Sequence, residues 1–376
     1  MPKIIPKIPE VFPDKFPGNF QNTIQYFGFF SREKILKNTG KLLMLDIDFG
    51  RYCSLNCPTC FRKSNIVDDA LKGDLTYDEL IKVIDEAMGL GLQSIKICGA
   101  GEPTQNSNFL RFLQDMTKRN IGVAVFTKGQ VLGNDKEAKK FYHSYGIKSA
   151  QELCNKLSKL KVSFMLSFQS FDTGKQDKLV GNIKNHAFVR NQALINLVNA
   201  GFTKTNPTRL ALELGPITKE NYDEIFDLYI YARRRNIYLI PNFLMTSGKQ
   251  IDKKFLKRHD LSNKQKYDLF IKIYRWNIQN GLQTIGQIKK EGVSCMPGIH
   301  PCNQIACGLY VTANGNVVGC PGFTEIEGNV KKEKLKDIWK KSQNYRTRKG
   351  VFNCKCPPKD GVVIPHDLYE KVLKNL

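Results

Sequence analysis

From residue 42 onward, short apolar segments alternate with segments whose apolar residues recur at helical spacing. Short apolar runs placed between helical segments are typical of buried strands in parallel sheets. The predicted strands lie at residues 42–49, 94–98, 121–126, 162–168, 209–214 and 237–243. Their connections are long enough for helices, so the strands should pair in parallel. Crossovers of one hand curl such a sheet toward a barrel, and the predicted fold class is therefore α/β.

Helices are predicted between these strands from their apolar faces and start signals. Thr76 and Glu79 form a capping box before a helix that stops at Gly89. Further helices are predicted at 109–118, after Ser149, at 188–200, after Thr218 and after Ser262. The polar segment 246–258 is predicted to be a loop.

The two ends of the chain depart from this alternation. Residues 1–20 carry prolines at positions 2, 6, 9, 13 and 17, which exclude helix and favour an extended arm. This arm either wraps the body of the protein or is loose. The aromatic-rich stretch 20–37 is predicted to pack against the body as a cover. We divide the chain into an arm (1–41), a barrel (42–281) and a small cysteine-rich hairpin and helix domain (282–376).

Three cysteines directly follow the first predicted strand. Cys53, Cys57 and Cys60 have the spacing Cys-x3-Cys-x2-Cys. Thiolates are the usual ligands of a [4Fe–4S] cluster, and three of them leave one of the four irons without a protein ligand. An open position on a metal is where chemistry takes place. A zinc site is the alternative, but zinc usually takes four Cys or His ligands, and the next candidates are Cys98 and His143.

This loop resembles the hallmark of the radical S-adenosylmethionine (radical SAM) superfamily, in which an aromatic residue, here Phe61, follows the third cysteine. The resemblance implies a partial (β/α)6 TIM-like barrel that is open on one side. It also implies that Cys53, Cys57 and Cys60 hold a [4Fe–4S] cluster whose free iron binds S-adenosylmethionine (SAM). One electron would then split SAM into methionine and a 5′-deoxyadenosyl radical.

A second motif, at the end of the second predicted strand, supports this interpretation. Gly99, Gly101 and Glu102 lie in the sequence Cys-Gly-Ala-Gly-Glu-Pro. Glycines let the backbone approach a ligand, and ligand sites of parallel barrels lie at this end of the strands. The motif resembles the Gly-Gly-Glu-Pro motif of radical SAM enzymes, which positions the SAM ammonium group. Ala100 replaces a glycine that many members have.

Polar residues at other strand ends are further candidates for the same site. Thr127 lies where the family often has a Thr-Asn-Gly turn beneath the adenosine. Ser167 and Gln169 lie where it tends to place polar groups near the ribose or the carboxylate of SAM. For each, a locally satisfied strand-end residue is the alternative. Glu213, inside an apolar strand, is a candidate to face the substrate; because a buried, unpaired carboxylate is costly, it should either have a cation partner or point outward. The sequence assigns no catalytic acid or base.

A second set of cysteines occupies the C-terminal region. They are Cys295, Cys302, Cys307, Cys320, Cys354 and Cys356. Two apolar runs around an Asn-Gly turn predict a hairpin that brings Cys307 and Cys320 to a common end. The region resembles the SPASM/twitch extension of radical SAM enzymes, through a Gly-x4-Cys hairpin and a Gly-Asn-Val segment followed by an Ile-Trp helix.

This second resemblance implies an auxiliary [4Fe–4S] cluster held by Cys302, Cys307, Cys320 and either Cys354 or Cys356. If neither later cysteine binds, the open iron of a three-cysteine cluster would bind substrate. The Cys-x2-Cys-x5-Cys run of a full SPASM domain is absent, so we expect one auxiliary cluster. A zinc knuckle is the alternative, because cysteine-only sites also suit zinc. The first cysteine of the set has no assigned role.

Composition is that of a soluble, cytoplasmic enzyme. Hydrophobic residues make up 41% of the chain, and no apolar run approaches the roughly 20 residues that span a bilayer. Eleven cysteines without an export signal indicate a reducing cytoplasm and metal binding rather than disulfides. The net charge of +23 reflects either dispersed, solvated lysines, which we favour, or a nucleic-acid surface.

The leading hypothesis is a radical SAM oxidoreductase that oxidises or rearranges a peptide or protein side chain, or a small molecule, by hydrogen abstraction. It implies a one-electron donor of flavodoxin or ferredoxin type, and such acidic proteins would suit the positive charge. The alternatives are an RNA-modifying radical SAM enzyme and a non-enzymatic zinc- or RNA-binding protein with structural thiols. The resemblance covers residues from about 42 to 356, and its motifs bind cofactors rather than substrate.

Overall fold

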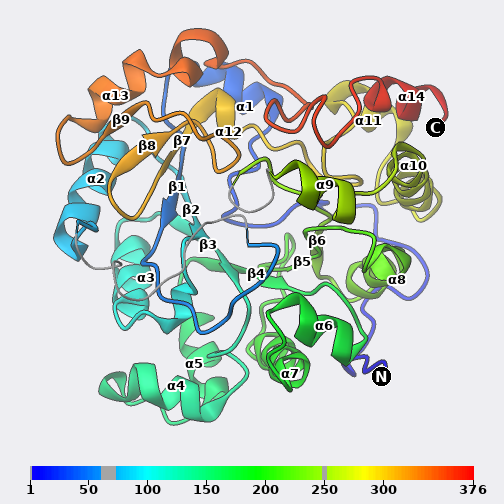
Figure 1. The fold of residues 1–376 in the computed structure, drawn as a ribbon, viewed down its shortest axis with the longest axis horizontal. Coiled ribbons are helices and arrows are strands. Elements are labelled where there is room, and N and C mark those ends of the chain that lie inside the picture. Colours follow the sequence, from blue (N-terminus) through cyan, green and yellow to red (C-terminus); the bar gives the residue numbers. More distant parts are fainter. Residues whose placement is uncertain (1, 61–72, 248–251) are drawn as a thin grey trace.

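A single curved sheet joins the barrel to the C-terminal region. In this computed structural model, residues 2–60, 73–247 and 252–376 are described. Within them nine strands form one sheet in the order β6-β5-β4-β3-β2-β1-β7-β8-β9 (Figure 1). The strands are β1 (Met44–Asp48), β2 (Ser94–Gly99), β3 (Gly122–Thr127), β4 (Val162–Ser167), β5 (Leu210–Glu213), β6 (Tyr238–Ile240), β7 (Gly308–Val311), β8 (Asn316–Val318) and β9 (Gly328–Asn329). Neighbours from β6 to β7 are parallel, and β7, β8 and β9 are antiparallel.

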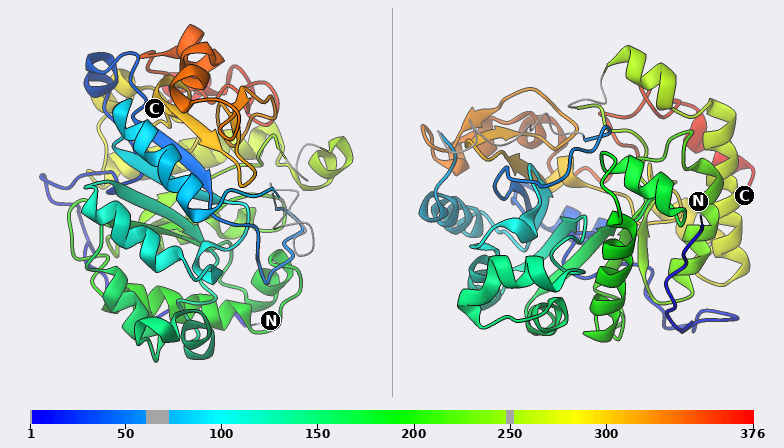
Figure 2. Two further views of the ribbon diagram at one scale, coloured as in Figure 1. Left: turned by 90° about the vertical axis from the view of Figure 1, so that its left-hand side faces the viewer. Right: turned by 60° about the horizontal axis from the view of Figure 1, so that its bottom comes forward.

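Helices lie around the outside of this sheet (Figures 1 and 2). Those before β6 are α1 (Arg32–Lys37), α2 (Tyr77–Gly89), α3 (Phe109–Lys118), α4 (Asp135–Tyr142), α5 (Ala150–Leu157), α6 (Thr173–Leu179), α7 (His186–Asn199) and α8 (Tyr222–Arg233). Those after β6 are α9 (Lys253–His259), α10 (Asn263–Gln279), α11 (Ile285–Glu291), α12 (Gln304–Cys307), α13 (Leu335–Lys341) and α14 (Leu368–Lys374). Short 3-10 turns occupy Pro103–Gln105 and His143–Tyr145, and a π-helical turn occupies Asn344–Arg348.

The six predicted strands are all present, and a helix lies in each connection between them. Pairing is parallel throughout β1 to β6, as the long crossovers indicate. The described sheet ends at β6 and β9 rather than closing on itself. The prediction of a partial, TIM-like barrel with a C-terminal hairpin is therefore confirmed.

Two local predictions were wrong. The helix after Thr218 begins only at Tyr222, because the side chain of Asn221 accepts a hydrogen bond from the Thr218 backbone N–H at 2.8 Å and holds the intervening residues in a turn. The segment 246–258, predicted to be a loop, contains most of α9. The carboxylate of Asp252 caps this helix by accepting hydrogen bonds from two backbone N–H groups of its first turn.

The C-terminal hairpin continues the barrel sheet at the free edge of β1. β7 pairs with β1 in parallel, with Met44 opposite Gly308 and the strands in register to the end of β7. Asp48, at the end of β1, accepts hydrogen bonds from the Tyr310 hydroxyl and from the Ala313 backbone N–H, the latter at 3.1 Å. The strand that leads into the first cysteine loop is thus tied directly to the C-terminal region.

The N-terminal arm is extended and lies against the amino-terminal ends of the barrel strands. The Ser163 hydroxyl on β4 donates to the Gln25 carbonyl at 2.7 Å, and the Gln25 N–H donates to the Thr208 carbonyl, just before β5, at 3.0 Å. The Ser94 hydroxyl on β2 donates to the Tyr26 carbonyl. The arm therefore covers the end of the barrel opposite the first cysteine loop.

The arginine run at the end of α8 helps to hold this arm. Arg233 is 2% exposed and donates to the side chain of Asn22. Arg234 and Arg235 both pair with Glu10, at 3.7 and 3.3 Å. These cations make contacts within the fold, which favours a structural role for the run over a nucleic-acid surface.

We expect Asp48→Ala to destabilise the protein through the junction of β1 and β7. The substitution leaves the buried Tyr310 hydroxyl and the Ala313 N–H without their acceptor, at a cost on the order of 1–3 kcal/mol for each group. The midpoint of thermal unfolding, followed by circular dichroism, should fall clearly below that of the wild type. Asp268→Ala, at an exposed position on α10, should change it little. Equal midpoints for the two variants would contradict this role of Asp48.

Candidate functional site

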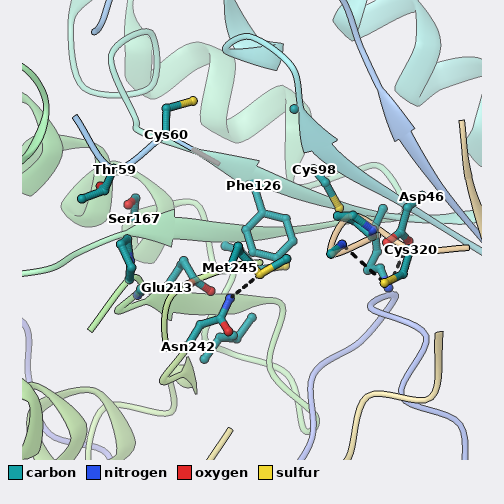
Figure 3. A pocket seen from close by; sticks show the side chains of 18 of the residues that line it. Asp46, Thr59, Cys60, Cys98, Phe126, Ser167, Glu213, Asn242, Met245 and Cys320 are labelled. Carbon is teal, nitrogen blue, oxygen red and sulfur yellow. Dashed lines mark hydrogen bonds and ion pairs between the residues drawn. The ribbon is translucent and has the colours of Figure 1, made fainter. Parts of the chain in front are cut away.

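The three cysteines of the first motif lie on the loop after β1, at the carboxyl-terminal end of the barrel strands. Cys53, Cys57 and Cys60 all line one cavity of about 300 Å³ (Figure 3). Burial, together with the nearby Glu102 carboxylate, raises the pKa of Cys53 to about 12. Burial also raises the pKa of Cys57, and the ammonium of Lys128 opposes both shifts. Because these buried thiols resist ionisation, a metal partner must displace their protons, and its positive charge then stabilises the thiolates.

The turn after β2 packs directly on the backbone of this loop. The Gly101 N–H donates to the Gly50 carbonyl at 3.1 Å, and the Glu102 N–H donates to the Tyr52 carbonyl at 2.8 Å. A β-carbon on Gly101 would lie 2.1 Å from the Tyr52 carbonyl oxygen, so this approach requires glycine. The glycine and glutamate motif therefore positions the cysteine loop in addition to lining the cavity.

Gln105 also braces the cysteine loop, and the sequence analysis missed it. Its Oε1 accepts a hydrogen bond from the Ser54 N–H at 3.0 Å, and its Nε2 donates to Ser54 Oγ at 2.8 Å. Gln130 Nε2 donates to the same hydroxyl at 3.4 Å. The sequence holds no signal for these contacts, because the partners lie 51 and 76 residues apart in the chain.

The carboxylate of Glu102 is buried and ties the end of β2 to the end of β3. Its Oε1 accepts hydrogen bonds from the hydroxyls of Thr104 and Thr127, each at 2.6 Å. Its Oε2 accepts one from the Lys128 backbone N–H at 2.8 Å. A carboxylate oxygen can accept more than one hydrogen bond, so Oε2 keeps capacity for a further donor such as an amine. The geometry is compatible with the predicted contact to SAM.

The remaining strand-end candidates divide into two groups. Thr127 and Ser167 line the cavity, and Ser167 Oγ accepts a hydrogen bond from Lys128 Nζ at 2.7 Å. Gln169 does not line it: its side chain is fully buried and donates to a backbone carbonyl after β5 at 2.9 Å. Phe61 lies outside the described residues.

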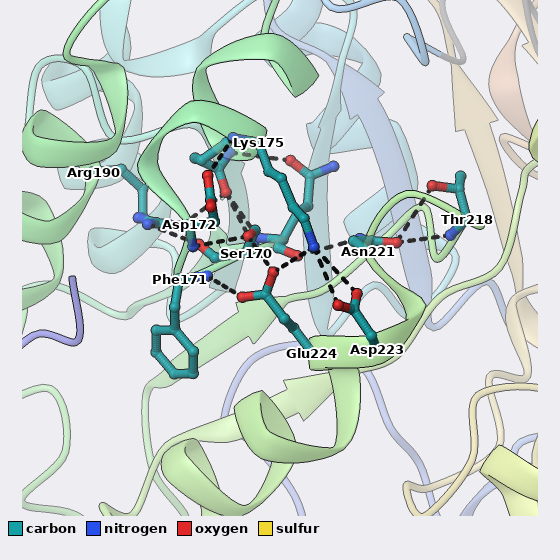
Figure 4. A network of polar contacts seen from close by, with 11 residues as sticks. Ser170, Phe171, Asp172, Lys175, Arg190, Thr218, Asn221, Asp223 and Glu224 are labelled. Carbon is teal, nitrogen blue, oxygen red and sulfur yellow. Dashed lines mark hydrogen bonds and ion pairs between the residues drawn. The ribbon is translucent and has the colours of Figure 1, made fainter. Parts of the chain in front are cut away.

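Gln169 belongs instead to a buried polar network around α6, and Figure 4 shows the part of this network around Ser170 and Glu224. Gln176 Oε1 accepts hydrogen bonds from the backbone N–H groups of Gln169 and Ser170, at 3.1 and 3.3 Å. The Ser170 hydroxyl donates to Glu224 at 2.8 Å. Just beyond α6, a β-carbon on Gly181 would meet a carbonyl oxygen of the cysteine loop at 2.5 Å. The network therefore fixes an element that packs against the cysteine loop.

The cysteines of the C-terminal region also reach this cavity. Four of the six line it, namely Cys295, Cys302, Cys320 and Cys356. The thiol of Cys307 donates to the Asn303 carbonyl at 3.5 Å, and Cys354 lies against Gly292. The structure does not bring these last two cysteines to the cavity, although the sequence prediction included both.

Electrostatics differ among the four C-terminal thiols that line the cavity. A hydrogen bond from the Cys295 thiol lowers the pKa of Cys356 to about 7, and Lys359 acts in the same direction. The sulfur of Cys356 and burial raise the pKa of Cys295. Burial also raises the pKa of Cys302 and Cys320. Binding of a metal must displace the protons of the thiols whose pKa is raised.

A buried ion pair on β1 and β2 lies close to these cysteines. Lys96 Nζ is 3.0 Å from Asp46 Oδ1, donates to Gln304 at 2.9 Å and lies 5.1 Å from the centre of the Phe27 ring. Burial alone would lower the pKa of Lys96, but Asp46 and the nearby Cys302 thiol raise it. This cation can offset part of the negative charge of thiolates beside it.

The donors fit iron–sulfur clusters through their chemistry, because both sets that line the cavity consist of thiols. In the described ranges, no three His, Cys, Asp or Glu side chains are grouped closely enough to hold a single metal ion. None of the described cysteines forms a disulfide.

Comparison with known families identifies the C-terminal region. Residues 302–358 match the model of SPASM, an iron–sulfur cluster-binding domain. A curated relative from Pyrococcus furiosus, the tungsten-containing aldehyde ferredoxin oxidoreductase cofactor-modifying protein, is 25% identical over 205 residues. The match covers 53% of this chain and 51% of that protein, so the chain spans about half the length of this relative.

Solved structures share the fold of most of the chain. The structure of anSMEcpe with bound AdoMet gives a TM-score of 0.59 at 14% identity, over 88% of this chain and 95% of that chain. SuiB from Streptococcus suis, bound to the precursor peptide SuiA, gives 0.57 at 17% identity, over 84% and 69%. At these identities the likeness shows the fold alone, which is the partial barrel of radical SAM enzymes.

The predicted class is confirmed by the domain match, the relative and the fold together. Residues 302–358 match a SPASM-type iron–sulfur domain, and the chain as a whole is similar to radical SAM proteins. The SPASM match supports an iron–sulfur cluster in the C-terminal region, and among the structurally similar proteins SuiB and anSMEcpe have been solved with bound S-adenosylmethionine. No described helix has the length and apolar character needed to cross a bilayer.

We expect Gly101→Ala to remove the cluster of the first loop, because the added methyl group collides with the Tyr52 carbonyl and must displace the loop. After anaerobic reconstitution, iron per chain should fall by about four atoms, the content of one cubane. Gly89→Ala is the matched control, since nothing lies within 4 Å of a β-carbon there. Full iron content in the Gly101→Ala protein would contradict the proposed packing constraint.

Proposed function

We propose that this protein is an enzyme that cleaves SAM reductively and uses the resulting radical to oxidise or rearrange a substrate. The observation that carries the proposal is the shared cavity, which is lined by the three thiols of the first loop and by four thiols of the C-terminal region. A cavity that reaches both cysteine sets gives a substrate access to both cofactors.

The residues of the first loop and of the turn after β2 take separate roles in this proposal. Cys53, Cys57 and Cys60 hold the cluster, and the turn from Gly99 to Glu102 seats SAM, with Thr127 and Ser167 beside it. When bound, the reduced cluster and SAM supply a 5′-deoxyadenosyl radical that removes a hydrogen atom from the substrate. The barrel orients the substrate and excludes water.

The auxiliary cluster is assigned to the four cysteines that reach the cavity. These are Cys295, Cys302, Cys320 and Cys356. The assignment resolves the choice left open by the sequence in favour of Cys356 over Cys354, and it gives Cys295 a role. In this assignment Cys307, which the sequence had suggested as a ligand, is not one, because its thiol donates a hydrogen bond to a backbone carbonyl. Four thiolates complete the ligand set of a cubane, so the cluster would accept an electron rather than bind substrate through an open iron.

The shape and lining of the cavity restrict the substrate. Its walls carry large apolar side chains, including Phe126, Met165, Phe243 and Met296, and Phe27 of the N-terminal arm also lines it. Such a lining suits a small molecule or one side chain of a peptide or protein presented to it. SuiB binds a precursor peptide and the Pyrococcus furiosus relative is named for modifying a cofactor, which supports both substrate classes. An RNA substrate is less favoured, because the arginine run is engaged within the fold.

The chemistry requires a one-electron donor, for which an acidic protein of flavodoxin or ferredoxin type suits the net charge of +23. Thiols and clusters of this kind persist in a reducing compartment, so we assign the protein to the cytoplasm.

The test is to incubate the anaerobically purified protein with SAM and dithionite and to measure 5′-deoxyadenosine. We expect it from the wild type and not from Cys57→Ala, which lacks one ligand of the first cluster. Iron should be close to eight atoms per chain, the content of two cubanes. Stoichiometric zinc without iron, and no 5′-deoxyadenosine, would favour a non-enzymatic zinc protein.

We expect Glu102→Ala to weaken SAM binding, because it leaves the Lys128 N–H and two threonine hydroxyls without their common acceptor at the SAM end of the cavity. Hydrogen bonds to a charged group contribute about 1.5–3 kcal/mol, so the Kd for SAM should rise about tenfold or more. Equilibrium binding to the reconstituted protein measures this, with iron content checked in parallel. Glu370→Ala, at an exposed position on α14, is the control. Unchanged SAM affinity at normal iron content would mean that the motif is only a turn.

The auxiliary ligand set predicts different outcomes for neighbouring cysteines. Cys356→Ala should lose the auxiliary cluster and about four irons, whereas Cys354→Ala should keep both. Iron analysis with electron paramagnetic resonance of the reduced proteins distinguishes the two. The reverse pattern would assign the fourth position to Cys354.

A further inference from the structure

Among the described residues, six charged side chains line the cavity. Four of them lie at strand ends or in the loops beyond them. One of these four is Glu213, the last residue of β5: burial raises its pKa to about 7, and Lys359 is the largest influence in the opposite direction. Glu213 thus has the cation partner that a buried carboxylate requires. The remaining two, Asp46 and Lys96, lie in the middle of β1 and β2.

Asp46 and Lys96 form an ion pair that is shut off from solvent. They are partners in the parallel register of β1 and β2, they are 2% and 3% exposed, and Lys96 Nζ lies 3.0 Å from Asp46 Oδ1. In Figure 3, Asp46 lies with Cys98 and Cys320 at the side of the cavity away from Cys60. A buried ion pair adds little net stability, because the loss of hydration of two charges offsets their attraction. The free energy of folding therefore does not explain why this pair is present.

The ion pair is oriented, with its positive end toward the C-terminal cysteines. Lys96 Nζ donates a hydrogen bond to Gln304 Oε1 at 2.9 Å, and Gln304 begins α12, two residues after Cys302. The Asp46 carboxylate is instead hydrogen-bonded to the Cys98 thiol, near the end of β2. Lys96 is thus the member of the pair that contacts α12, the helix that follows Cys302.

The charges of the ion pair act on the thiols of the C-terminal region. Burial raises the pKa of Cys302 and of Cys307, and among the groups that oppose this rise Lys96 has the largest effect in both cases. Asp46 adds to the rise in the pKa of both thiols, but its effect is smaller than that of Lys96. The pair therefore acts on these thiols as a net positive charge.

Other charges act on the first cysteine loop. Burial raises the pKa of Cys53 and of Cys57, and the carboxylate and the lysine that act on both are Glu102 and Lys128. The two cysteine sets thus have separate electrostatic surroundings. A change at Lys96 should affect the C-terminal set more than the first.

Neighbouring side chains shield Lys96 from water, so its charge is weakly screened. Nζ lies 3.6 Å from Met44 Sδ and 5.1 Å from the centre of the Phe27 ring. Phe27 is 5% exposed and belongs to the N-terminal arm, which therefore helps to seal this part of the cavity wall. Charges interact more strongly where water is excluded, because the local dielectric constant is low.

We infer that Lys96 raises the reduction potential of the auxiliary cluster and that the opposite charge of Asp46 limits this effect. The inference rests on the proposed function, in which Cys302 is a ligand of that cluster. Reduction adds one electron and thus one negative charge, and a fixed positive charge nearby stabilises the reduced form. The potentials of iron–sulfur clusters depend on the charges and hydrogen bonds around them. Lys96 acts through the cluster, which accepts an electron more readily in its presence.

The test is a reductive titration of the reconstituted protein, in which electron paramagnetic resonance follows the auxiliary cluster. SAM is added because it binds the first cluster and changes the signal of that cluster, which separates the two signals. Lys96→Met removes the charge and keeps an unbranched side chain, so the midpoint potential of the auxiliary cluster should fall below that of the wild type. Lys96→Arg keeps the charge and should lie closer to the wild type. An unchanged midpoint in Lys96→Met would overturn the inference.

Asp46→Asn should change the potential in the opposite direction. The amide keeps the shape of the carboxylate and can present an oxygen to Lys96, but it removes the negative charge, so the midpoint potential should rise. This variant tests the inference whether or not Lys96→Met folds. A midpoint that falls or stays unchanged in Asp46→Asn would contradict the inference, because a disturbance of local structure alone gives no reason for a rise.

Lys266 provides a matched control. It is 2% exposed and pairs with Asp260 at 2.7 Å, but neither residue lines the cavity. Lys266→Met therefore also removes a buried lysine from an ion pair, and it should leave the midpoint potential of the auxiliary cluster unchanged. A fall as large as that in Lys96→Met would mean that both substitutions act through the stability of the fold, and the inference would then be wrong.

Iron analysis of the same samples distinguishes failure of this inference from failure of the proposed function. About eight irons per chain in the wild type and the variants, together with equal midpoints, would overturn the inference and leave the proposed function intact. About four irons per chain in the wild type, without a signal from a second cluster, would overturn the proposed auxiliary cluster and the inference with it.

Discussion

The parallel pairing of β1 with β7 is the interaction on which the arrangement of both cysteine sets depends. β1 leads into the first cysteine loop at its carboxyl end, whereas β7 begins directly after α12, at the amino end of β1. The hairpin then returns, so Cys320 lies on the same side as the start of β7. Five residues of strand rise on the order of 15 Å, and this length sets the scale of separation between the two sets along the barrel axis. The register of this strand pair thus sets how far apart the two cysteine sets lie.

Three lysines lie near the thiols that this arrangement brings to one cavity. Many thiols share one cavity, and their ionised forms repel one another in surroundings of low polarity. The chain places Lys96 near Cys302, Lys128 near Cys53 and Cys57, and Lys359 near Cys356. Three buried or half-buried ammonium groups thus accompany the thiols, and part of the large positive charge of the protein serves the site itself. The remainder is available to attract an acidic partner from solution.

The sequence predicted the barrel well because its signals are local. Apolar runs, a capping box and an Asn-Gly turn each depend on residues close together in the chain, and the corresponding strands, α2 and the β7–β8 hairpin are all present. The first cysteine motif and the turn from Gly99 to Glu102 were likewise found by spacing. What the sequence could not show were contacts between distant segments. The bracing of Ser54 by Gln105, the contact of Gly181 with the cysteine loop and the junction at Asp48 depend on tertiary packing alone.

The sequence could not choose among the later cysteines for a related reason. Cys307 and Cys320 flank the hairpin and lie at its common end, so spacing makes both equally good ligands. Whether a thiol faces the cavity is decided by the direction of the side chain, and at the end of α12 the Cys307 thiol is directed back toward Asn303. Cys295 precedes the hairpin after an irregular segment and carried no pattern at all.

The continuous sheet also limits how such proteins can be taken apart or recombined. β1 is covered on one edge by β2 and on the other by β7, and its residues Leu45 and Ile47 are fully buried. A fragment lacking β7 would present a long apolar edge to solvent, the kind of surface that pairs with other chains and precipitates. The C-terminal iron–sulfur region and the barrel are therefore not expected to fold independently of each other. The C-terminal region could be exchanged between two such barrels only if its β7 matched the β1 of the new barrel in register. It would also have to supply hydrogen-bond donors, as Tyr310 and Ala313 do here, for the carboxylate at the end of β1.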